Sequence, residues 1–320
     1  MMTYEDLHKL AEQFEICELA AVAAGPTPVN RDDFRAAVAS APYDLGYLRR
    51  TLEKRLDPGL VMPGVKTVIS GLVSYDVAPD RPSPLPDGTA WISRYAMGKD
   101  YHDIVGERFA ALAREIGRRF GCRAMSWVDT GPLAEKQWAV AAGLGFQGKN
   151  TLLVSPRLGS FVFIGIILTD AVYTGAAPAP VPTGCNGCGA CVAVCPTSAL
   201  DADGHLDRAR CLAHLTVNSK TELPVDVDQA GNLYGCDLCQ DVCPFNRGPD
   251  RSSAIESDVS RVDVRPSSPF RPLPGLFCPS LDEILNMDRE AFSRVFSGTP
   301  VLRRGLEGVQ RSARRLSGRN

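Results

Sequence analysis

The stretch CNGCGACVAVCP, residues 185–196, contains four cysteines at the spacing C-x2-C-x2-C-x3-C, followed directly by proline. A second stretch, GCDLCQDVCP at residues 235–244, contains three more cysteines before a proline, and Cys211 stands between the two. The first spacing is that of bacterial ferredoxins, in which four cysteine thiolates hold each [4Fe–4S] cluster. The two stretches and Cys211 together contain eight of the chain's eleven cysteines, enough for two clusters. The sequence therefore predicts a protein that transfers single electrons.

The cysteine spacing also divides the expected ligands into two groups. In two-cluster ferredoxins the cysteine before proline in one run binds the cluster of the other run. The ligands of the first cluster are then Cys185, Cys188, Cys191 and Cys243. Those of the second cluster are Cys195, Cys236 and Cys239, completed by the nearest remaining cysteine, Cys211.

Zinc and disulfides are the alternative uses of these cysteines. Paired C-x2-C motifs also bind zinc, but zinc ribbons do not add a third cysteine after two residues and a fourth before proline. Disulfides are disfavoured because no signal peptide precedes the chain and the cytosol keeps thiols reduced. Iron–sulfur clusters remain the favoured interpretation.

Composition and charge are those of an ordinary globular protein of about two domains. The net charge of −2 gives no overall sign of nucleic-acid binding, but residues 303–319 contain six arginines and one acid. Such a patch can bind phosphates, and a solvated helix face is the alternative. No apolar run reaches the roughly 20 residues of a membrane helix. With no twin-arginine leader at the amino terminus, we expect a cytoplasmic protein.

The apolar pattern predicts alternating helices and strands before the cysteines. A helix followed by a strand or turn is expected at 4–24, and further helices at 44–56, 101–120 and 133–142. Strands are expected at 65–73 and 124–128, with a pair at 151–154 and 161–169. Residues 175–184 indicate a linker and residues 251–274 an extended connector. Helices are expected again at 280–287, 289–296 and 299–315.

Asp129 follows a predicted strand and precedes a Gly-Pro turn. Such a position projects a side chain from a rigid scaffold, and a carboxyl group there can act as a general acid if burial raises its pKa. A cap for the following turn or helix is the alternative. The glycines of GLGFQGKNT, residues 143–151, allow either the close approach of a ligand or tight turns without one.

Several motifs, taken together, closely resemble those of epoxyqueuosine reductases from about residue 40 to residue 315. In chain order they are ISRYA at 92–96, GKDYH at 98–102, VDT at 128–130, GLGFQGKNT at 143–151, the two cysteine runs with Cys211, and GTPVLRR at 298–304.

The resemblance implies an α+β fold in four parts. They are a nitroreductase-like, cobalamin-binding α/β domain at 1–174, a linker at 175–184, a ferredoxin-like domain with two [4Fe-4S] clusters at 185–250, and a connector with a helical basic tail at 251–320. It implies reduction of epoxyqueuosine to queuosine at the tRNA wobble position, with electrons passing through the clusters to cobalamin. Asp129 is the implied proton donor, and His102 is the alternative acid. The residues implied to line the corrin site are Arg94, Tyr95, His102, Asp129, Lys149, Asn150, Thr151 and Leu153.

Two features depart from the family pattern. Ile166 stands where many members carry Glu, so the contact made by that Glu is absent. Some relatives continue into a carboxy-terminal helical repeat, whereas this chain stops at Asn320. We expect the remaining phosphate contacts to come from Arg303, Arg304, Arg311, Arg314 and Arg315. The expected partners are a tRNA substrate and an external low-potential electron donor, with no membrane, and we expect a monomer.

Two other functions compete with this interpretation. A related corrinoid reductase could act on another substrate, such as an organohalide, although the missing export leader and the final cysteine run count against it. The protein could instead be a two-cluster electron carrier or a corrinoid-handling protein without catalytic activity. The roughly 180 residues that precede the clusters are more than a carrier needs.

Overall fold

A computed structural model describes residues 1–176, 178–247 and 268–318, which form two compact units. The first unit comprises Met1–Ser74 and His102–Asn186, and the second comprises Tyr75–Tyr101 and Gly187–Asn320. The chain thus leaves the first unit after Ser74 and returns at His102, an excursion that the expected domain ranges do not include. Those ranges remain predictions. Most of the expected connector at 251–274 lies outside the described residues.

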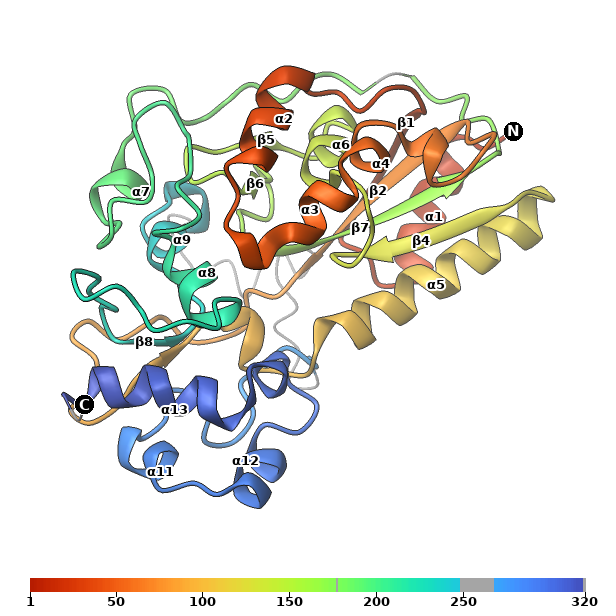
Figure 1. The fold of residues 1–320 in the computed structure, drawn as a ribbon. Coiled ribbons are helices and arrows are strands. Elements are labelled where there is room, and N and C mark those ends of the chain that lie inside the picture. The colour runs from red at the N-terminus through yellow and green to blue at the C-terminus, as the bar shows by residue number, and fades with distance from the viewer. Residues whose placement is uncertain (177, 248–267, 319–320) are drawn as a thin grey trace. The chain divides into compact units, whose positions relative to one another are not determined.

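The first unit contains a four-stranded sheet in the order β1-β2-β7-β4 (Figure 1). Its strands are β1 (Glu18–Ala23), β2 (Thr67–Ser74), β4 (Ala124–Val128) and β7 (Val162–Thr169). Each neighbouring pair is antiparallel. Every residue of β2 is buried, which confirms the central strand expected at 65–73.

The expected pairing of residues 151–154 with 161–169 is wrong. β6 (Leu153–Val154) pairs instead with β5 (Phe146–Gln147). β7 lies between β2 and β4, so the backbone groups on both of its edges are already paired. Only the bridge between Ser155 and Gly159 joins the two sides of the predicted turn.

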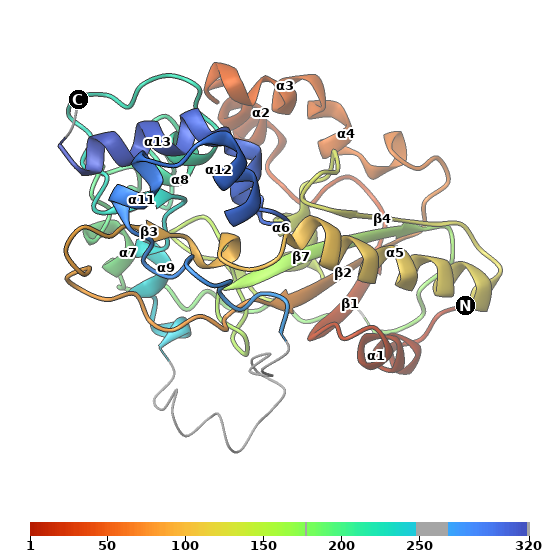
Figure 2. The ribbon, with the colours of Figure 1, turned by 90° about the horizontal axis from the view of Figure 1, so that it is seen from below.

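Helices cover both faces of this sheet. α5 (Tyr101–Phe120) lies along one face, as Figure 2 shows. There Gly71 and Gly165 face each other across β2 and β7, and a Cβ on either would lie within 2.8 Å of the Phe109 ring. The two glycines therefore let the helix approach the sheet. α6 (Glu135–Ala141) packs on the other face, where Trp138 joins the core with Val68 and Ile166.

The remaining helices of the first unit include α1 (Tyr4–Gln13), which was expected, and α2 (Arg31–Ala39), which was not. The others are α3 (Gly46–Arg50) and α4 (Leu52–Leu56), with short 3₁₀ turns at Tyr43–Leu45 and Pro58–Leu60. The single helix expected at 44–56 is broken at Thr51, whose φ of −109° and ψ of 10° separate α3 from α4. Among the described residues, no helix is long and apolar enough to span a bilayer.

The second unit is built from short elements around a larger apolar core, with a smaller cluster of Leu212, Leu215, Leu223 and Val227. Strands β3 (Trp91–Ile92) and β8 (Asn232–Tyr234) pair in parallel. Its helices are α7 (Ala190–Ala193), α8 (Leu212–Val217), α9 (Leu238–Asp241), α11 (Leu281–Leu285), α12 (Arg289–Val295) and α13 (Gly305–Leu316), with 3₁₀ turns at Arg94–Ala96, Pro244–Asn246 and Pro300–Arg304. The last three helices confirm the helical tail expected from the sequence. Trp91, Leu233, Phe296 and Val309 lie in the shared core.

Candidate active site and cluster-binding cysteines

Asp129 lies in a strained turn at the end of β4. Its φ of 58° is in the left-handed region, and the Thr130 N–H donates a 2.6 Å hydrogen bond to the Val128 carbonyl. A three-residue turn with a positive central φ is rare and strained, although Asp tolerates this region better than most residues. Gly131 follows because a Cβ there would lie 2.7 Å from the Trp127 side chain. The sequence Asp-Thr-Gly thus makes a turn that few others can form.

Two side chains from neighbouring helices contact Asp129. The Asp129 N–H donates a 2.8 Å hydrogen bond to Glu135 Oε1 at the start of α6. His102 Nε2, from α5, lies 3.5 Å from Asp129 Oδ2. The Asp129 side chain is 62% exposed and that of His102 is 15% exposed. The turn thus projects the Asp129 carboxyl group outward, so burial does not supply the condition considered for its role as an acid, and that role stays a prediction.

Glu135 is the acid in this group whose protonation the structure shifts. Burial raises the pKa of Glu135 well above its usual value, and the nearby charge of Asp129 raises it further. The hydrogen bond from the Asp129 N–H and the charge of Arg55 act in the opposite direction. No motif of the sequence singles out Glu135, although an acid six residues after a strand-end Asp, at the start of a predicted helix, is a usable signal.

Arg55, at the end of α4, holds the other side of the Asp129 turn. Its Nη1 donates to the Leu133 carbonyl at 2.8 Å, and its Nη2 donates to the Gly131 carbonyl at 3.3 Å. Burial lowers the pKa of Arg55, while the charges of Tyr47, Glu135 and Asp129 oppose that shift. A cavity of about 500 Å³ lies beside the turn, a size that suits a small-molecule site. It is lined by Tyr47, Thr51, Lys54, Arg55, Asp129, Thr130 and Pro132.

The loop at 143–153 forms a second strained turn. Thr151 has a φ of 64°, which is unfavourable for a β-branched residue. The Thr151 N–H donates to the Gly148 carbonyl at 2.8 Å, and the Thr151 carbonyl accepts a hydrogen bond from Lys136 Nζ at 2.6 Å. A Cβ on Gly145 would lie 2.3 Å from the Val154 carbonyl oxygen. Gly145 is thus explained by a tight turn in the chain itself.

The candidate corrin residues of this loop differ in exposure. Asn150 is buried, and its Oδ1 accepts a hydrogen bond from the Leu152 N–H at 3.2 Å. Leu153 is buried in the core. Lys149 and Thr151 are partly exposed. Of the four residues, Lys149 and Thr151 therefore have side chains that a ligand can reach.

Arg94 and Tyr95 belong to the second unit, and Arg94 is buried there. Its guanidinium hydrogen-bonds Asp241 and lies 3.8 Å from Asp237 Oδ2. The charge of Arg94 is thus held by carboxylates inside the unit, and its expected role at the corrin site stays a prediction. Tyr95 packs against Tyr101 and Tyr234, with ring centroids 6.1 and 6.2 Å away.

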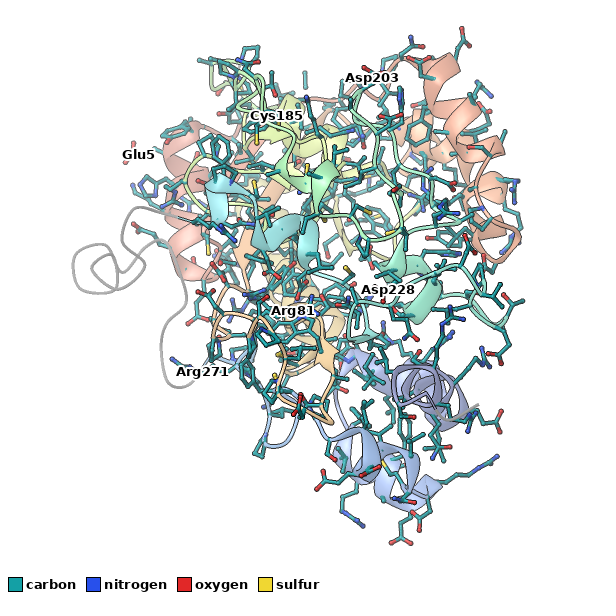
Figure 3. The ribbon with its side chains drawn as sticks, turned by 90° about the vertical axis from the view of Figure 1, so that its left-hand side faces the viewer. Glu5, Arg81, Cys185, Asp203, Asp228 and Arg271 are labelled. Atoms are coloured by element: carbon teal, nitrogen blue, oxygen red, sulfur yellow. The ribbon has the colours of Figure 1, made fainter. Side chains whose placement is uncertain are left out.

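Asp237 organises the segment that follows β8. Its carboxylate accepts hydrogen bonds from Trp91 Nε1 at 3.0 Å, from the Arg94 N–H at 2.8 Å and from Ser93 Oγ at 2.5 Å. Arg81, labelled in Figure 3, lies over the Trp91 ring at 5.7 Å. Asp237 stands between two candidate ligands, Cys236 and Cys239, so this network fixes the backbone that carries them.

Seven of the eight candidate ligands lie in the second unit, and Cys185, labelled in Figure 3, ends the first. Cys191 is on α7 and Cys239 is on α9, and these helices contact each other. Cys211 caps α8, which contacts β8, the strand directly before Cys236.

Burial raises the pKa of three of the four cysteines assigned to the second cluster. It raises the pKa of Cys211, that of Cys236 to about 12, and that of Cys239 well above its usual value. The charges of neighbouring thiols add to these shifts: Cys195 acts on Cys211, Cys211 acts on Cys236 and Cys239, and Cys191 also acts on Cys239. A buried group of this kind is stable as thiolates only around cations. The donor set therefore fits an iron–sulfur cluster.

The tail arginines mostly contact the loop at 219–227. Arg304 donates to the Ser219 carbonyl, and Arg311 donates to that of Lys220 at 2.9 Å and lies 3.2 Å from Glu222. Arg303 pairs with Asp100 at 2.8 Å, yet its side chain remains 53% exposed. Of the five arginines expected to bind phosphate, Arg303 and Arg314 are thus the exposed ones.

Comparisons with known proteins agree with these features. The sequence matches the family model described as epoxyqueuosine reductase QueG, DUF1730, over residues 55–130, and that of the 4Fe-4S double cluster binding domain over residues 184–246. Epoxyqueuosine reductase of Gloeobacter violaceus is 40% identical over 269 residues, which cover 83% of this chain and 80% of that protein. That of Lactococcus garvieae is 32% identical over 96% of this chain and 84% of its own length. A crystal structure of epoxyqueuosine reductase with an epoxyqueuosine-modified tyrosine tRNA stem loop has a TM-score of 0.81 and 28% identity, covering 97% of this chain and 79% of that one.

Proposed function

The chain belongs to the epoxyqueuosine reductase family, and we propose that it removes the epoxide oxygen of epoxyqueuosine in tRNA to give queuosine. The reaction takes two electrons and two protons, and the oxygen leaves as water. The observation that carries the proposal is the combination, in one chain of this family, of a double-cluster domain with an acid in a rigid turn beside a cavity. A two-cluster electron carrier has no need of the second feature.

The cofactors are two [4Fe–4S] clusters and cobalamin. In our proposal Cys185, Cys188, Cys191 and Cys243 hold one cluster, and Cys195, Cys211, Cys236 and Cys239 hold the other. Cobalamin, when bound, supplies a cobalt centre that exchanges one or two electrons at low potential. Lys149, Thr151 and His102 of the first unit are the proposed polar contacts of its amide groups. The partial exposure of Lys149 and Thr151 supports this choice.

Asp129 is the proposed proton donor to the departing oxygen. Its carboxyl group is exposed beside the cavity, and its backbone is fixed by Glu135, so it can meet a substrate with little reorganisation. His102 Nε2 lies within 3.5 Å of the same carboxyl group and is the proposed route by which the proton is replaced. A general acid of this kind contributes about 10²- to 10⁴-fold to the rate.

tRNA is the substrate and therefore the partner of the chain. We propose that Arg303, Arg304 and Arg311 contribute to a phosphate-binding patch, with Arg303 and the exposed Arg314 as its most accessible members. An external low-potential donor supplies the electrons in this proposal, the protein acts as a monomer, and the reaction takes place in the cytoplasm, where tRNA is modified.

The proposal is tested by an anaerobic assay. Reconstituted protein, cobalamin and a chemical reductant are mixed with tRNA that carries epoxyqueuosine, and the digested nucleosides are weighed by mass spectrometry. We expect wild-type protein to remove one oxygen mass from the nucleoside in a reaction that depends on cobalamin. We expect Asp129→Asn to retain its clusters but to lose nearly all of this activity. No change with clusters and cobalamin bound would contradict the proposed substrate, and a halogenated aromatic would be tested next. Wild-type turnover by Asp129→Asn would remove Asp129 from the mechanism.

A further inference from the structure

The two strained turns of the first unit are connected to consecutive residues of one helix. Glu135 Oε1 accepts the hydrogen bond from the Asp129 N–H, and Lys136 Nζ donates to the Thr151 carbonyl. Glu135 and Lys136 are the first two residues of α6. Asp129 and Thr151 both have positive φ values and both belong to the residues proposed for proton donation or cofactor contact.

A positive φ in a residue with a side chain is unfavourable and persists only where the surroundings impose it. Thr151 carries the greater penalty because it is β-branched, whereas Asp tolerates the left-handed region. Without its acceptor, the Asp129 N–H loses the contact that fixes the turn from the α6 side. Without Lys136, the Thr151 carbonyl loses a charge-assisted hydrogen bond, which is stronger than one between neutral groups.

α6 itself is firmly anchored. Trp138 and Ala139 are buried in the core against β2 and β7. The amino-terminal end of α6 is therefore held in place, and its side chains can restrain both the Asp129 turn and the Thr151 turn. Resting on the proposed function, we propose that Glu135 and Lys136 act as positioning residues, which hold the Asp129 and Thr151 turns in the conformations that the reaction requires.

The Glu135 half is tested by comparing Glu135→Ala with Glu135→Gln. Gln keeps a side-chain oxygen that can accept the Asp129 N–H, and Ala removes it. We expect kcat to fall about tenfold or more in Glu135→Ala, because small misplacements of a catalytic group are costly. KM for tRNA should change little, and Glu135→Gln should restore most of the rate. Glu115→Ala, which removes an acid of α5 paired with Arg118, is the matched control. Wild-type kcat in Glu135→Ala, or an equal loss in Glu135→Gln, would overturn this half.

The Lys136 half is tested without turnover, by a double-mutant cycle in chemical unfolding. Glycine adopts a positive φ without strain, so Thr151→Gly removes the need for a restraint. We expect Lys136→Met to destabilise the wild-type protein more than the Thr151→Gly background. Equal losses in both backgrounds would overturn the coupling.

The same cycle with Glu135→Ala and Asp129→Gly gives a stability readout for the first turn. It separates this inference from the proposed function. If Asp129→Asn retained full activity while both cycles showed coupling, the role of Asp129 in catalysis would be wrong but the restraint of the turns would stand. If Asp129→Asn were inactive and neither cycle showed coupling, the proton donor would stand and the restraint by α6 would be rejected.

Discussion

Arg94 and Asp237 form an ion pair in the interior of the second unit, with Nη1 and Oδ2 3.8 Å apart and side-chain exposures of 1% and 0%. Arg94 comes from the excursion between the two parts of the first unit, and Asp237 comes from the cysteine run that follows β8. The pair therefore fastens the excursion to the segment that carries Cys236 and Cys239. Asp241, hydrogen-bonded to the same guanidinium, adds a second carboxylate.

Removing the guanidinium should unfold the second unit more easily. Arg94→Met leaves two carboxylates inside the protein without their counter-ion, and breaking a buried pair in this way costs about 3–5 kcal/mol. We expect a loss of that size in the free energy of unfolding, measured by urea titration of anaerobically prepared protein. Arg118→Met, which breaks an exposed pair with Glu115, is the control and should change stability little. Equal stabilities of the two variants would show that the buried pair is not structural.

The outcome for Arg94 shows what sequence patterns could and could not predict. Helix α5, at residues 101–120, and strand β4, at 124–128, lie at the predicted positions, because apolar period and flanking breakers determine local structure. The pairing of residues 151–154 with 161–169 was wrong because a strand's partners depend on contacts distant in sequence. A motif match identified Arg94 but could not reveal the buried carboxylates around it.

The candidate site divides in the same way. The cysteines could be assigned to groups because thiolate spacing is fixed by cluster geometry. Asp129 stood out through its motif, but its exposure and positive φ depend on how the turn packs against Trp127 and α6. Glu135 went unnoticed because its hydrogen bond to the Asp129 backbone exists only in the folded chain.

The charge of Asp237 should lower the reduction potential of the neighbouring cluster. Adding an electron beside a buried carboxylate is unfavourable, and net charge near a cluster is one of the factors that set its potential. We expect Asp237→Asn to raise the midpoint potential of the cluster proposed for Cys236 and Cys239, and Arg94→Gln to lower it. An EPR-monitored redox titration measures both. Asp201→Asn, at an exposed acid of the same unit, is the control. Shifts of the midpoint potential with the same sign in Asp237→Asn and Arg94→Gln would indicate a general disturbance of the cluster rather than an effect of charge.

Cys211 should be required for one cluster only. Cys211→Ala removes one of the four ligands proposed for that cluster, the others being Cys195, Cys236 and Cys239. We expect the iron content to fall from about eight towards about four per chain, with the EPR signal of one cluster retained. Cys278→Ala, at a cysteine outside both runs, is the matched control and should keep full iron. Unchanged iron in Cys211→Ala would refute the ligand assignment.

The partly buried Glu135 of the first unit should make the free energy of unfolding depend on pH. Burial, followed by the charge of Asp129, raises the pKa of Glu135 above its usual 4.5, and Arg55 only partly opposes this. The folded state therefore favours the neutral carboxyl group, whose stabilising contribution is complete below pH 4.5 and is lost as the pH rises through the raised pKa. Glu135→Gln cannot ionise and should escape that loss.

The free energy of unfolding of Glu135→Gln, relative to wild type, should therefore increase as the pH rises above 4.5 and level off once Glu135 is ionised in both states. Urea unfolding of both proteins at a series of pH values measures the difference. Every other titrating group is present in both proteins. The contribution of such a group to the free energy of unfolding cancels in the difference unless the group is coupled to Glu135. Asp129→Asn should reduce the effect, because it removes the neighbouring charge that helps to raise the pKa. A difference that stays constant across this range would mean that Glu135 titrates alike in the folded and unfolded chain, and that its contact with the Asp129 turn does not disfavour its charge.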